Sequence, residues 1–308
     1  MTGAEQVAAA LGPASRSVSW WRCRCPVHQS GSDALALRDG EHGLIVKCFG
    51  GCPSAAVRAE LRRLGLLDDA AGAPPPLAPA EVRRQHEAEE HNRRKRIAIA
   101  LDFWHHETAS PNETAVERYW LARGLALPLP PTIRASRSWL RHPDGGSRPA
   151  MIALVQHADH RPVAIHRTWL AVDGSGKASF RSPRLSLGPT GGAAVHLADA
   201  TEHEPLVIGE GIETAASVMV ATGFPAWAAI SAGGIERLIL PALPAASSVI
   251  IAADYDRNGT GERAARTAAE RWLAEGRRVR IALPPIPGSD WNDVLQNKDN
   301  METRHAAA

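Results

Sequence analysis

The most informative absence in this 308-residue sequence concerns cysteine, because residues 53 to 308 contain none. All four cysteines lie between Cys23 and Cys52. A disulfide framework spreads its cysteines through a secreted chain, whereas a tight group in a cytosolic protein is typical of a metal site. The cysteine distribution therefore predicts a metal-binding module near the N-terminus.

Long apolar runs are also missing. No stretch approaches the ~20 apolar residues that span a bilayer, and Met1 to Ala10 lacks the basic start and apolar core of a signal peptide. We therefore expect a cytoplasmic protein that makes no use of a membrane.

No Gly-x-x-x-x-Gly-Lys-Ser/Thr sequence occurs either, so we expect no fused P-loop helicase motor. A helicase partner, if one is needed, would be a separate protein.

The formal net charge is only +2, but basic residues are unevenly distributed. Between Pro130 and Thr190 there are eight Arg and one Lys against three Asp and no Glu. This excess favours a polyanionic partner, and the alternative is a solvated basic surface. Trp139 and Trp169 in the same stretch are expected to pack in the core, and the alternative is that they stack on bases. The candidate nucleic-acid-binding residues are Arg134, Arg137, Arg167, Lys177, Arg181 and Arg184.

Composition and periodicity divide the chain into five expected segments. They are an N-terminal metal module (1–68), a Pro-rich linker (69–80), a helical and mixed α+β basic segment (81–202), a C-terminal domain (203–296) and a flexible tail (297–308). From Pro205 onward, short apolar runs alternate with helical patterns. The expected strands are 206–209, 226–230, 248–253 and 278–283, and the expected helices are 213–222, 235–240 and 261–275. This alternation predicts an α/β domain with a mainly parallel, Rossmann-like sheet that is covered on both faces.

The N-terminal module contains two closely spaced ligand pairs, Cys-x-Cys-Pro-Val-His and Cys-Phe-Gly-Gly-Cys. Tetrahedral zinc needs two turns that each present two ligands, and the segment between the pairs suits a hairpin. The preferred zinc ligands are Cys25, His28, Cys48 and Cys52, in a structural, zinc-ribbon type of site. Cys23 is the spare thiol, which either replaces Cys25 or lies outside the site.

Three acidic clusters follow expected strands of the C-terminal domain. They contain Glu210, the pair Asp254 and Asp256, and Asp290. In an open parallel sheet the carboxyl ends of the strands open onto one crevice, so separate strands can deliver these groups to one point. Hard oxygen ligands of this kind suit Mg²⁺ or Mn²⁺, and phosphoryl transfer is the natural reaction of such a site.

Glu-Gly after one strand, Asp-x-Asp after a later strand and a third acidic cluster downstream resemble the Toprim domain over residues 203 to 296. That domain is shared by bacterial primases, topoisomerases and some nucleases. The N-terminal ligand pairs resemble the zinc-binding domain of bacterial-type, phage and plasmid primases, although the second pair carries one residue more than the usual Cys-x-x-Cys. The middle segment, with Tyr119-Trp120-Leu121 and Arg123-Gly124-Leu125, is loosely similar to primase-helicases of mobile elements.

The resemblance implies a DNA primase, which is a nucleotidyl transferase that takes nucleoside triphosphates and a single-stranded DNA template during DNA replication. It implies Glu210 as a general base or metal-proximal acid, and Asp254, Asp256 and Asp290 as metal ligands. Glu213 and Asp293 are interpreted as charges at helix N-termini, which the helix dipole favours, and the alternative is that they support the metal ligands. Arg167 and Arg184 are the candidates for triphosphate contacts.

Three alternatives are weighed against the primase. A Toprim nuclease uses the same acidic site, but the primase-like zinc module argues against it. A catalytically inactive protein that binds single-stranded nucleic acid is disfavoured by the retained acidic residues. A topoisomerase needs a nucleophilic tyrosine, and only Tyr119 and Tyr255 exist.

Overall fold

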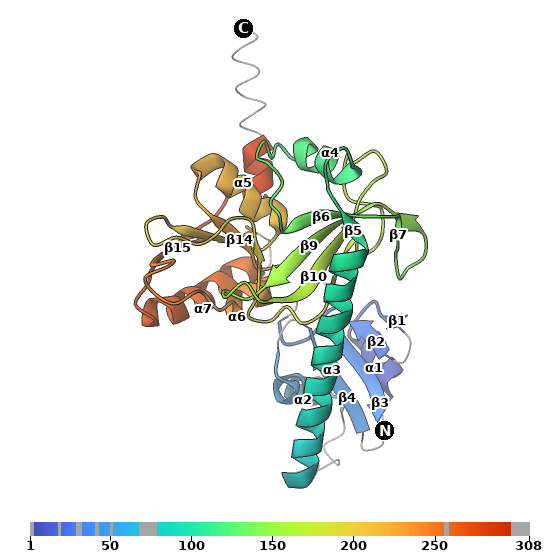
Figure 1. Ribbon diagram of the computed structural model, residues 1–308. Coiled ribbons are helices and arrows are strands. Elements are labelled where there is room, and N and C mark those ends of the chain that lie inside the picture. The colour runs from blue at the N-terminus through green and yellow to red at the C-terminus, as the bar shows by residue number, and fades with distance from the viewer. Residues whose placement is uncertain are drawn as a thin grey trace. The chain divides into compact units, whose positions relative to one another are not determined.

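A computed structural model describes residues 3–17, 20–28, 33–40, 43–49, 52–67, 79–255 and 259–296 of the chain. The chain divides into two compact units, residues 1–84 and 85–308, and Figure 1 labels the elements of both. The expected tail, and all of the expected linker except its last two residues, lie outside the described residues. No helix in the described ranges is both long and apolar enough to cross a membrane.

The first unit is built on an antiparallel sheet in the order β1-β2-β3-β4. Its strands are β1 (Ser15–Ser17), β2 (Trp20–Cys23), β3 (Leu35–Gly40) and β4 (Gly43–Cys48), and its helices are α1 (Ala4–Ala10) and α2 (Ser54–Arg63). β3 and β4 form the expected hairpin, in which Leu35 lies opposite Cys48.

One face of this sheet is apolar and carries both helices. Leu35 and Leu37 of β3 share a core with Val7 of α1 and Leu61 of α2. Because side chains alternate along a strand, their neighbours point to the opposite face. That outer face carries Trp20, Arg22, Arg38 and Lys47.

Helix α3 (Pro79–His106) crosses the boundary between the two units, and the second unit continues with an antiparallel sheet in the order β11-β10-β9-β6-β5. The strands are β5 (Thr108–Ala109), β6 (Ile133–Ser136), β9 (Ala150–Gln156), β10 (Pro162–Trp169) and β11 (Arg184–Leu187). A separate hairpin pairs β7 (Leu140–Arg141) with β8 (Ser147–Arg148), and α4 (Ala115–Ala122) lies between β5 and β6 in the sequence.

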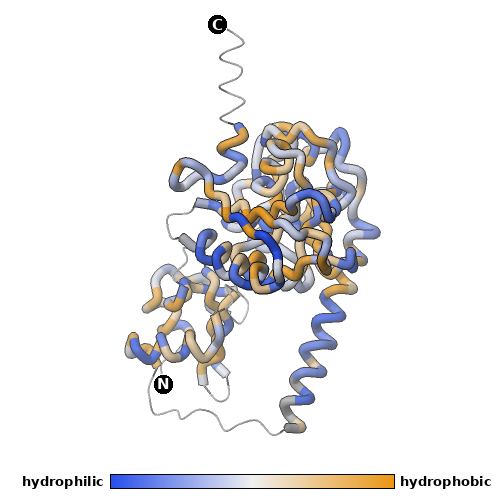
Figure 2. The backbone as a smooth tube through the Cα atoms, turned by 90° about the vertical axis from the view of Figure 1, so that its left-hand side faces the viewer, coloured by the Kyte–Doolittle hydropathy of each residue, from blue (hydrophilic) through white to orange (hydrophobic). Residues whose placement is uncertain are grey.

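The two faces of this middle sheet have different partners. The first turns of α3 are mostly hydrophilic, as Figure 2 shows, and Ala100 and Trp104 near its end pack against Ile152 and Ile165. Alternate residues of β9 share another core with α4 and with the C-terminal domain. The middle sheet is therefore packed between the end of α3 and that domain.

The C-terminal sheet has the order β12-β14-β13-β15-β16, and every pairing in it except that of β12 is parallel. Its strands are β12 (Val195–His196), β13 (Leu206–Gly209), β14 (Ala226–Ala228), β15 (Ser248–Ala252) and β16 (Arg278–Ala282). The helices are α5 (Ile212–Thr222), α6 (Ala232–Arg237) and α7 (Thr260–Ala274). The expected α/β class and mainly parallel sheet are confirmed.

Helices cover both faces of the parallel sheet. Val207 of β13 shares a core with Ala215 of α5, whereas its neighbour Ile208 shares a second core with Ile235 of α6 and Trp272 of α7. α5 therefore lies on the face that also meets the middle segment, and α6 and α7 lie on the other face (Figure 1).

The prediction for α6 was wrong by three residues at each end, since the helix spans Ala232–Arg237 and was expected at 235–240. Its start is set by Ser231, whose hydroxyl accepts a hydrogen bond from the Gly234 amide at 3.0 Å. Gly234 is required there because a Cβ atom would lie 1.9 Å from the Ala229 carbonyl oxygen.

Candidate metal centres and the acidic edge of the sheet

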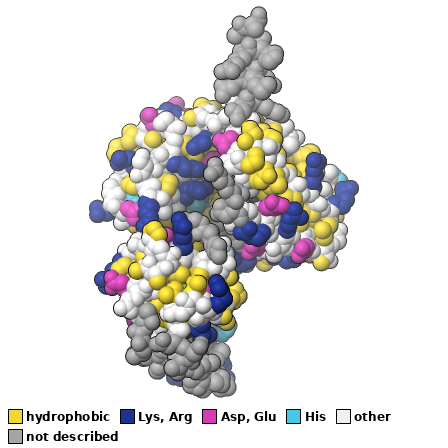
Figure 3. Space-filling view, turned by 180° about the vertical axis from the view of Figure 1, so that it is seen from behind, with side chains coloured by type: hydrophobic (Ala, Val, Ile, Leu, Met, Phe, Trp, Pro, Cys, Tyr) yellow, Lys and Arg dark blue, Asp and Glu magenta, His cyan; other side chains and the backbone are white. Residues whose placement is uncertain are grey.

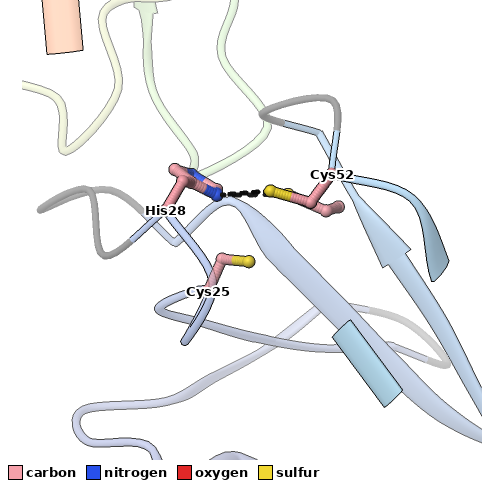
Figure 4. Close-up of side chains that lie close together, drawn as sticks. Cys25, His28 and Cys52 are labelled. Atoms are coloured by element: carbon pink, nitrogen blue, oxygen red, sulfur yellow. Dashed lines mark hydrogen bonds between the residues drawn. The ribbon is translucent and has the colours of Figure 1, made fainter. Parts of the chain in front are cut away.

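Two turns of the first unit bring three thiols and one imidazole together. Cys25 and His28 follow β2, Cys48 is the last residue of β4, and Cys52 lies two residues before α2. One ligand atom from each of the four lies within 4.8 Å of all the others. His28 Nδ1 is 3.1 Å from Cys52 Sγ and 3.6 Å from Cys48 Sγ, and Figure 4 shows this side of the group. The donor set and the turn geometry fit a tetrahedral zinc ion.

Cys23 lies outside this group, in the apolar core of the same unit. Burial raises the pKa of the Cys23 thiol to about 11, so this side chain behaves as a small neutral apolar group. Burial and the neighbouring thiols of Cys25 and Cys48 raise the pKa of Cys52 to about 12. A bound cation has the opposite effect and lowers the pKa of a coordinating thiol, because thiols lose their protons when they bind a metal ion.

The parallel sheet places two predicted acidic residues at one edge. Gly209 lies level with Ala252 in the pairing of β13 with β15. Glu210 therefore directly follows one strand, and Asp254 follows the neighbouring strand by two residues. Asp256 lies outside the described residues.

Asp290 lies in the loop beside Asp254. The Tyr255 amide donates to the Ser289 carbonyl at 3.4 Å, and the Gly288 amide donates to the Tyr255 carbonyl at 2.7 Å. Asp290 Oδ1 also accepts from the backbone amides of Asn292 and Asp293, at the start of helical residues 291–296.

Asp293 accepts in return from the Asp290 amide at 3.1 Å. The helix N-terminal interpretation of Asp293 is confirmed. Asp290 has the same capping role in the structure, which the sequence interpretation did not assign to it.

The carboxylates at this edge are hard oxygen donors, as Mg²⁺ and Mn²⁺ require. Within the described residues, however, the Cys25 group is the one set of three or more His, Cys, Asp or Glu side chains whose ligand atoms all lie within 4.8 Å. The carboxylates of Glu210, Asp254 and Asp290 are thus suitable ligands for a divalent cation. In the described part of the chain, however, these carboxylates are not close enough together to form a complete cation site by themselves.

Glu213 is the most deeply buried acid of this region, with 7% of its surface exposed. It lies in the first turn of α5, as expected. Its Oε1 atom is 2.9 Å from Lys177 Nζ and accepts a hydrogen bond from the Tyr119 hydroxyl at 2.5 Å. Burial alone would raise the pKa of Glu213, but the Lys177 ammonium and the Tyr119 hydroxyl hold it at about 2.

The predicted nucleic-acid-binding residues fall into different environments. Arg134 lies over the ring of Trp104, with its Cζ 4.4 Å from the ring centroid, and Arg167 lies over Trp169 at 5.2 Å. Burial lowers the pKa of the Arg167 guanidinium. Arg137, Arg181 and Arg184 are exposed, whereas Lys177 is paired with Glu213. Basic side chains gather on the face of the larger unit that Figure 3 shows.

The two tryptophans of the basic segment differ. Trp169 is fully buried, and its indole N–H donates to the Leu140 carbonyl at 2.9 Å, so the core prediction is confirmed for it. Trp139 is 57% exposed beside the β7–β8 hairpin, so the core prediction is wrong for it. His142 lies in the turn of this hairpin, and its buried ring stacks on Phe180 with the ring centroids 4.1 Å apart. Trp139 is not part of that contact.

Sequence reasoning missed the contacts of two further polar residues. Thr214 donates to Asp254 Oδ1 at 3.2 Å. Asn292 is 1% exposed and donates to the Arg123 carbonyl at 2.7 Å and to Ser217 Oγ at 3.0 Å. These three hydrogen bonds join residues far apart in the chain, and no spacing rule predicts such partners.

Comparison with protein families finds two matches. A domain of unknown function (DUF7146) matches residues 94–197, and the Toprim domain matches residues 205–300. A search of curated proteins finds no match to this chain.

Several solved structures match this chain at low identity and with TM-scores below 0.5. The DnaG primase catalytic domain bound to ssDNA is 17% identical, with a TM-score of 0.46, over 71% of this chain and 83% of that one. The Aquifex aeolicus primase, with zinc-binding and RNA polymerase domains, is 13% identical, with a TM-score of 0.44, over 98% of this chain and 82% of that one. The primase fragment of the bacteriophage T7 primase-helicase is 15% identical, with a TM-score of 0.37, over 62% and 70%.

None of these likenesses assigns a role to a residue here. The range matched by the Toprim family model contains strands β13 to β16 and the candidate acidic residues Glu210, Asp254 and Asp290. Residues 205–300 of this chain are a Toprim domain.

Proposed function

We propose that this chain is a DNA primase, which synthesises short primers on single-stranded DNA by metal-dependent nucleotidyl transfer in the cytoplasm. The observation that carries the proposal is a Toprim domain with Glu210 and Asp254 after neighbouring parallel strands, in one chain with a Cys₃His group. A zinc module and an acidic Toprim edge together suit template binding and phosphoryl transfer.

In the proposed reaction, the 3′-oxygen of the primer attacks the α-phosphorus of a nucleoside triphosphate, and pyrophosphate leaves as the bond to the bridging oxygen breaks. Mg²⁺ or Mn²⁺, when bound, lowers the pKa of the 3′-hydroxyl and neutralises charge on the leaving group. Glu210, Asp254, Asp256 and Asp290 are the residues that would hold this cation. Glu210 also accepts the proton of the hydroxyl.

Two surfaces have the chemistry of single-stranded DNA binding. On the outer face of the N-terminal sheet, Arg38 lies over Trp20 at 4.7 Å, and Arg22 lies over the exposed ring of Phe49 at 4.2 Å. Aromatic rings stack on bases and neighbouring cations contact phosphates, without a preference for sequence.

The second surface is the β7–β8 hairpin, where exposed Trp139 has Arg137 and Arg141 as near neighbours in the chain, and Arg148 lies opposite Leu140 in the strand pairing. For the triphosphate, Arg184 suits the contact better than Arg167. Arg184 is exposed on β11, whereas Arg167 is stacked on a buried tryptophan.

The test is primer synthesis on single-stranded DNA with labelled nucleoside triphosphates and Mg²⁺ or Mn²⁺. Wild type is compared with Asp254→Asn and with the control Asp159→Asn, an exposed aspartate in the turn between β9 and β10. Short labelled products from wild type and the control, but not from Asp254→Asn, are expected.

Metal-dependent shortening of the template would instead establish a Toprim nuclease. DNA binding with neither reaction, in the presence and absence of an added replicative helicase, would overturn the enzymatic proposal in favour of a binding protein.

A further inference from the structure

The first turn of α5 makes two side-chain contacts with other parts of the fold, one through Glu213 and one through Thr214. On one side, the buried carboxylate of Glu213 is fixed by Lys177 and Tyr119 of the middle segment. On the other side, the next residue, Thr214, donates its hydroxyl to Asp254 Oδ1 at 3.2 Å. Thr214 is 3% exposed, so water does not compete freely for its hydroxyl.

The backbone around Asp254 has little room to move. A Cβ atom on Gly261, in the first turn of α7, would lie 2.8 Å from the Asp254 carbonyl oxygen. A Cβ atom on Gly209 would lie 2.8 Å from the Ala215 amide nitrogen, so α5 lies directly against the end of β13. Two backbone hydrogen bonds join Tyr255 to the 288–289 loop.

The Thr214 hydroxyl holds one oxygen of the Asp254 carboxylate in a defined place. A hydrogen bond of this kind favours one orientation of the group. Metal-ligating carboxylates commonly depend on such a partner, which orients them before the metal arrives.

We propose that Thr214 is a positioning residue for Asp254, and that its hydroxyl holds the carboxylate in the orientation that binds the divalent cation. This inference rests on the proposed function, since it takes Asp254 as a metal ligand. Glu213 serves as the anchor that fixes the turn on which Thr214 lies. Thr214 itself contacts neither the metal nor the substrate.

The test measures Mn²⁺ binding to the zinc-loaded protein, without DNA or nucleotide, by the electron paramagnetic resonance signal of free Mn²⁺. Thr214→Val keeps the shape of the side chain and removes the hydroxyl. We expect it to weaken Mn²⁺ binding by about 10- to 100-fold, the range typical when a hydrogen-bond partner of a metal ligand is removed. Thr214→Ser restores the donor and should restore the affinity.

Thr222 gives a matched control on the same helix, because its hydroxyl donates to the Val218 carbonyl at 2.7 Å and makes no contact with the acidic edge. Thr222→Val should bind Mn²⁺ as wild type does. If Thr214→Val does not fold, Thr214→Ala also removes the hydroxyl, and thermal unfolding of each variant shows which proteins are intact.

The outcomes separate this inference from the proposed function. Wild-type Mn²⁺ affinity in a folded Thr214→Val or Thr214→Ala variant, with binding abolished in Asp254→Asn, would overturn the positioning role and leave the metal site standing. Retention of Mn²⁺ binding in Asp254→Asn would overturn the metal site itself. Failure of Thr214→Ser to restore binding would show that bulk, and not the hydroxyl, decides the affinity.

Discussion

Glu213 shows how one residue can join two parts of a fold. Its carboxylate lies in the Toprim domain, and both of its side-chain partners, Tyr119 and Lys177, come from the segment before that domain. An acid with this little exposure is stable as an anion only because an ammonium and a hydroxyl replace its water.

Replacing Lys177 by Met should therefore destabilise the protein strongly, because it leaves a buried carboxylate without its cation. We expect a decrease of about 3 to 5 kcal/mol in the free energy of unfolding at pH 7, measured by urea unfolding. Lys95→Met, at an exposed position on α3, is the control and should change stability little. Equal stability of the two variants would contradict the buried-pair interpretation.

The same carboxylate makes stability depend on pH in acid. The folded-state pKa of Glu213 is about 2, below the ordinary glutamate value. Its contribution is complete above the unfolded pKa of about 4.3 and is lost as the pH falls toward 2. Glu213→Gln should flatten the fall in unfolding free energy over that range, as urea titrations at several pH values would show; an unchanged slope would contradict the prediction.

Two buried histidines add a second pH dependence, at higher pH. Burial, with neighbouring positive charge, lowers the pKa of His166 to about 4 and that of His196 to about 3. The stability contributed by both neutral rings is complete above the unfolded pKa of about 6.5, and it is lost as the pH falls from that value toward the folded pKa values of about 4 and 3.

We expect the unfolding free energy to drop by about 1.4 kcal/mol per pH unit for each ring below pH 6. His196→Phe keeps an aromatic ring where His196 stacks on Trp227 and should reduce this slope. His203→Phe, at an exposed position, should not. Urea unfolding between pH 5 and 7 measures both slopes, and equal slopes would count against the assignment.

At the scale of elements, the two turns that follow β2 and β4 present all four candidate zinc ligands. The pairing of β3 with β4 brings these turns to the same end of the sheet, since Leu35 lies opposite Cys48. Cys23 ends β2 with its side chain in the apolar core, outside the group that the four candidate ligands form.

Zinc content tests this arrangement with a matched pair of cysteines. Cys25→Ser should reduce the zinc that copurifies with the chain well below one equivalent, whereas Cys23→Ala should leave about one equivalent bound. Atomic absorption of the dialysed proteins gives both numbers. Loss of zinc from Cys23→Ala alone would show that Cys23, and not Cys25, is a zinc ligand.

The β7–β8 hairpin offers an element-scale test of DNA binding. Trp139→Ala should weaken single-stranded DNA binding by about 1 to 3 kcal/mol if the ring stacks on a base. Arg141→Ala and Arg148→Ala should each lower the salt dependence of binding by about 0.7 in the logarithmic slope for each phosphate that the arginine neutralises. Fluorescence anisotropy at several salt concentrations measures both, with exposed Leu273→Ala of α7 as the control. Unchanged affinity in Trp139→Ala would remove the hairpin from the binding surface.

At the scale of the molecule, the two compact units have separate cores. The apolar cluster of the first unit draws on residues up to 67, and the three clusters of the second unit draw only on residues from 97 onward. Small units with small cores depend on a metal for stability more than large ones do.

Chelation of zinc should therefore affect only part of the molecule. We expect calorimetry to show two unfolding transitions, of which the one belonging to residues 1–84 disappears or is strongly lowered with a chelator. The transition of residues 85–308 should stay within a few degrees of its position. A single transition that moves as a whole would show that the units unfold together.

The sequence by itself determined the alternation of strands and helices in the Toprim domain, the hairpin between the two ligand pairs, and the positions of Glu210 and Asp254 after their strands. Each of these follows from local periodicity, from turn residues or from the rule that carboxyl ends of parallel strands share an edge. The start of α6 was also readable in principle, because Ser231 is a typical N-cap residue.

Only the tertiary structure decided which partner each polar side chain meets. It brought Lys177 and Tyr119 to Glu213, brought Thr214 to Asp254, buried Trp169 and exposed Trp139. Such pairings join residues that are tens of positions apart in the chain and depend on how sheets and helices pack. The spacing of residues within one motif does not predict which distant residues come together. The motifs therefore determine which chemical groups the site contains, and tertiary packing determines how those groups are oriented.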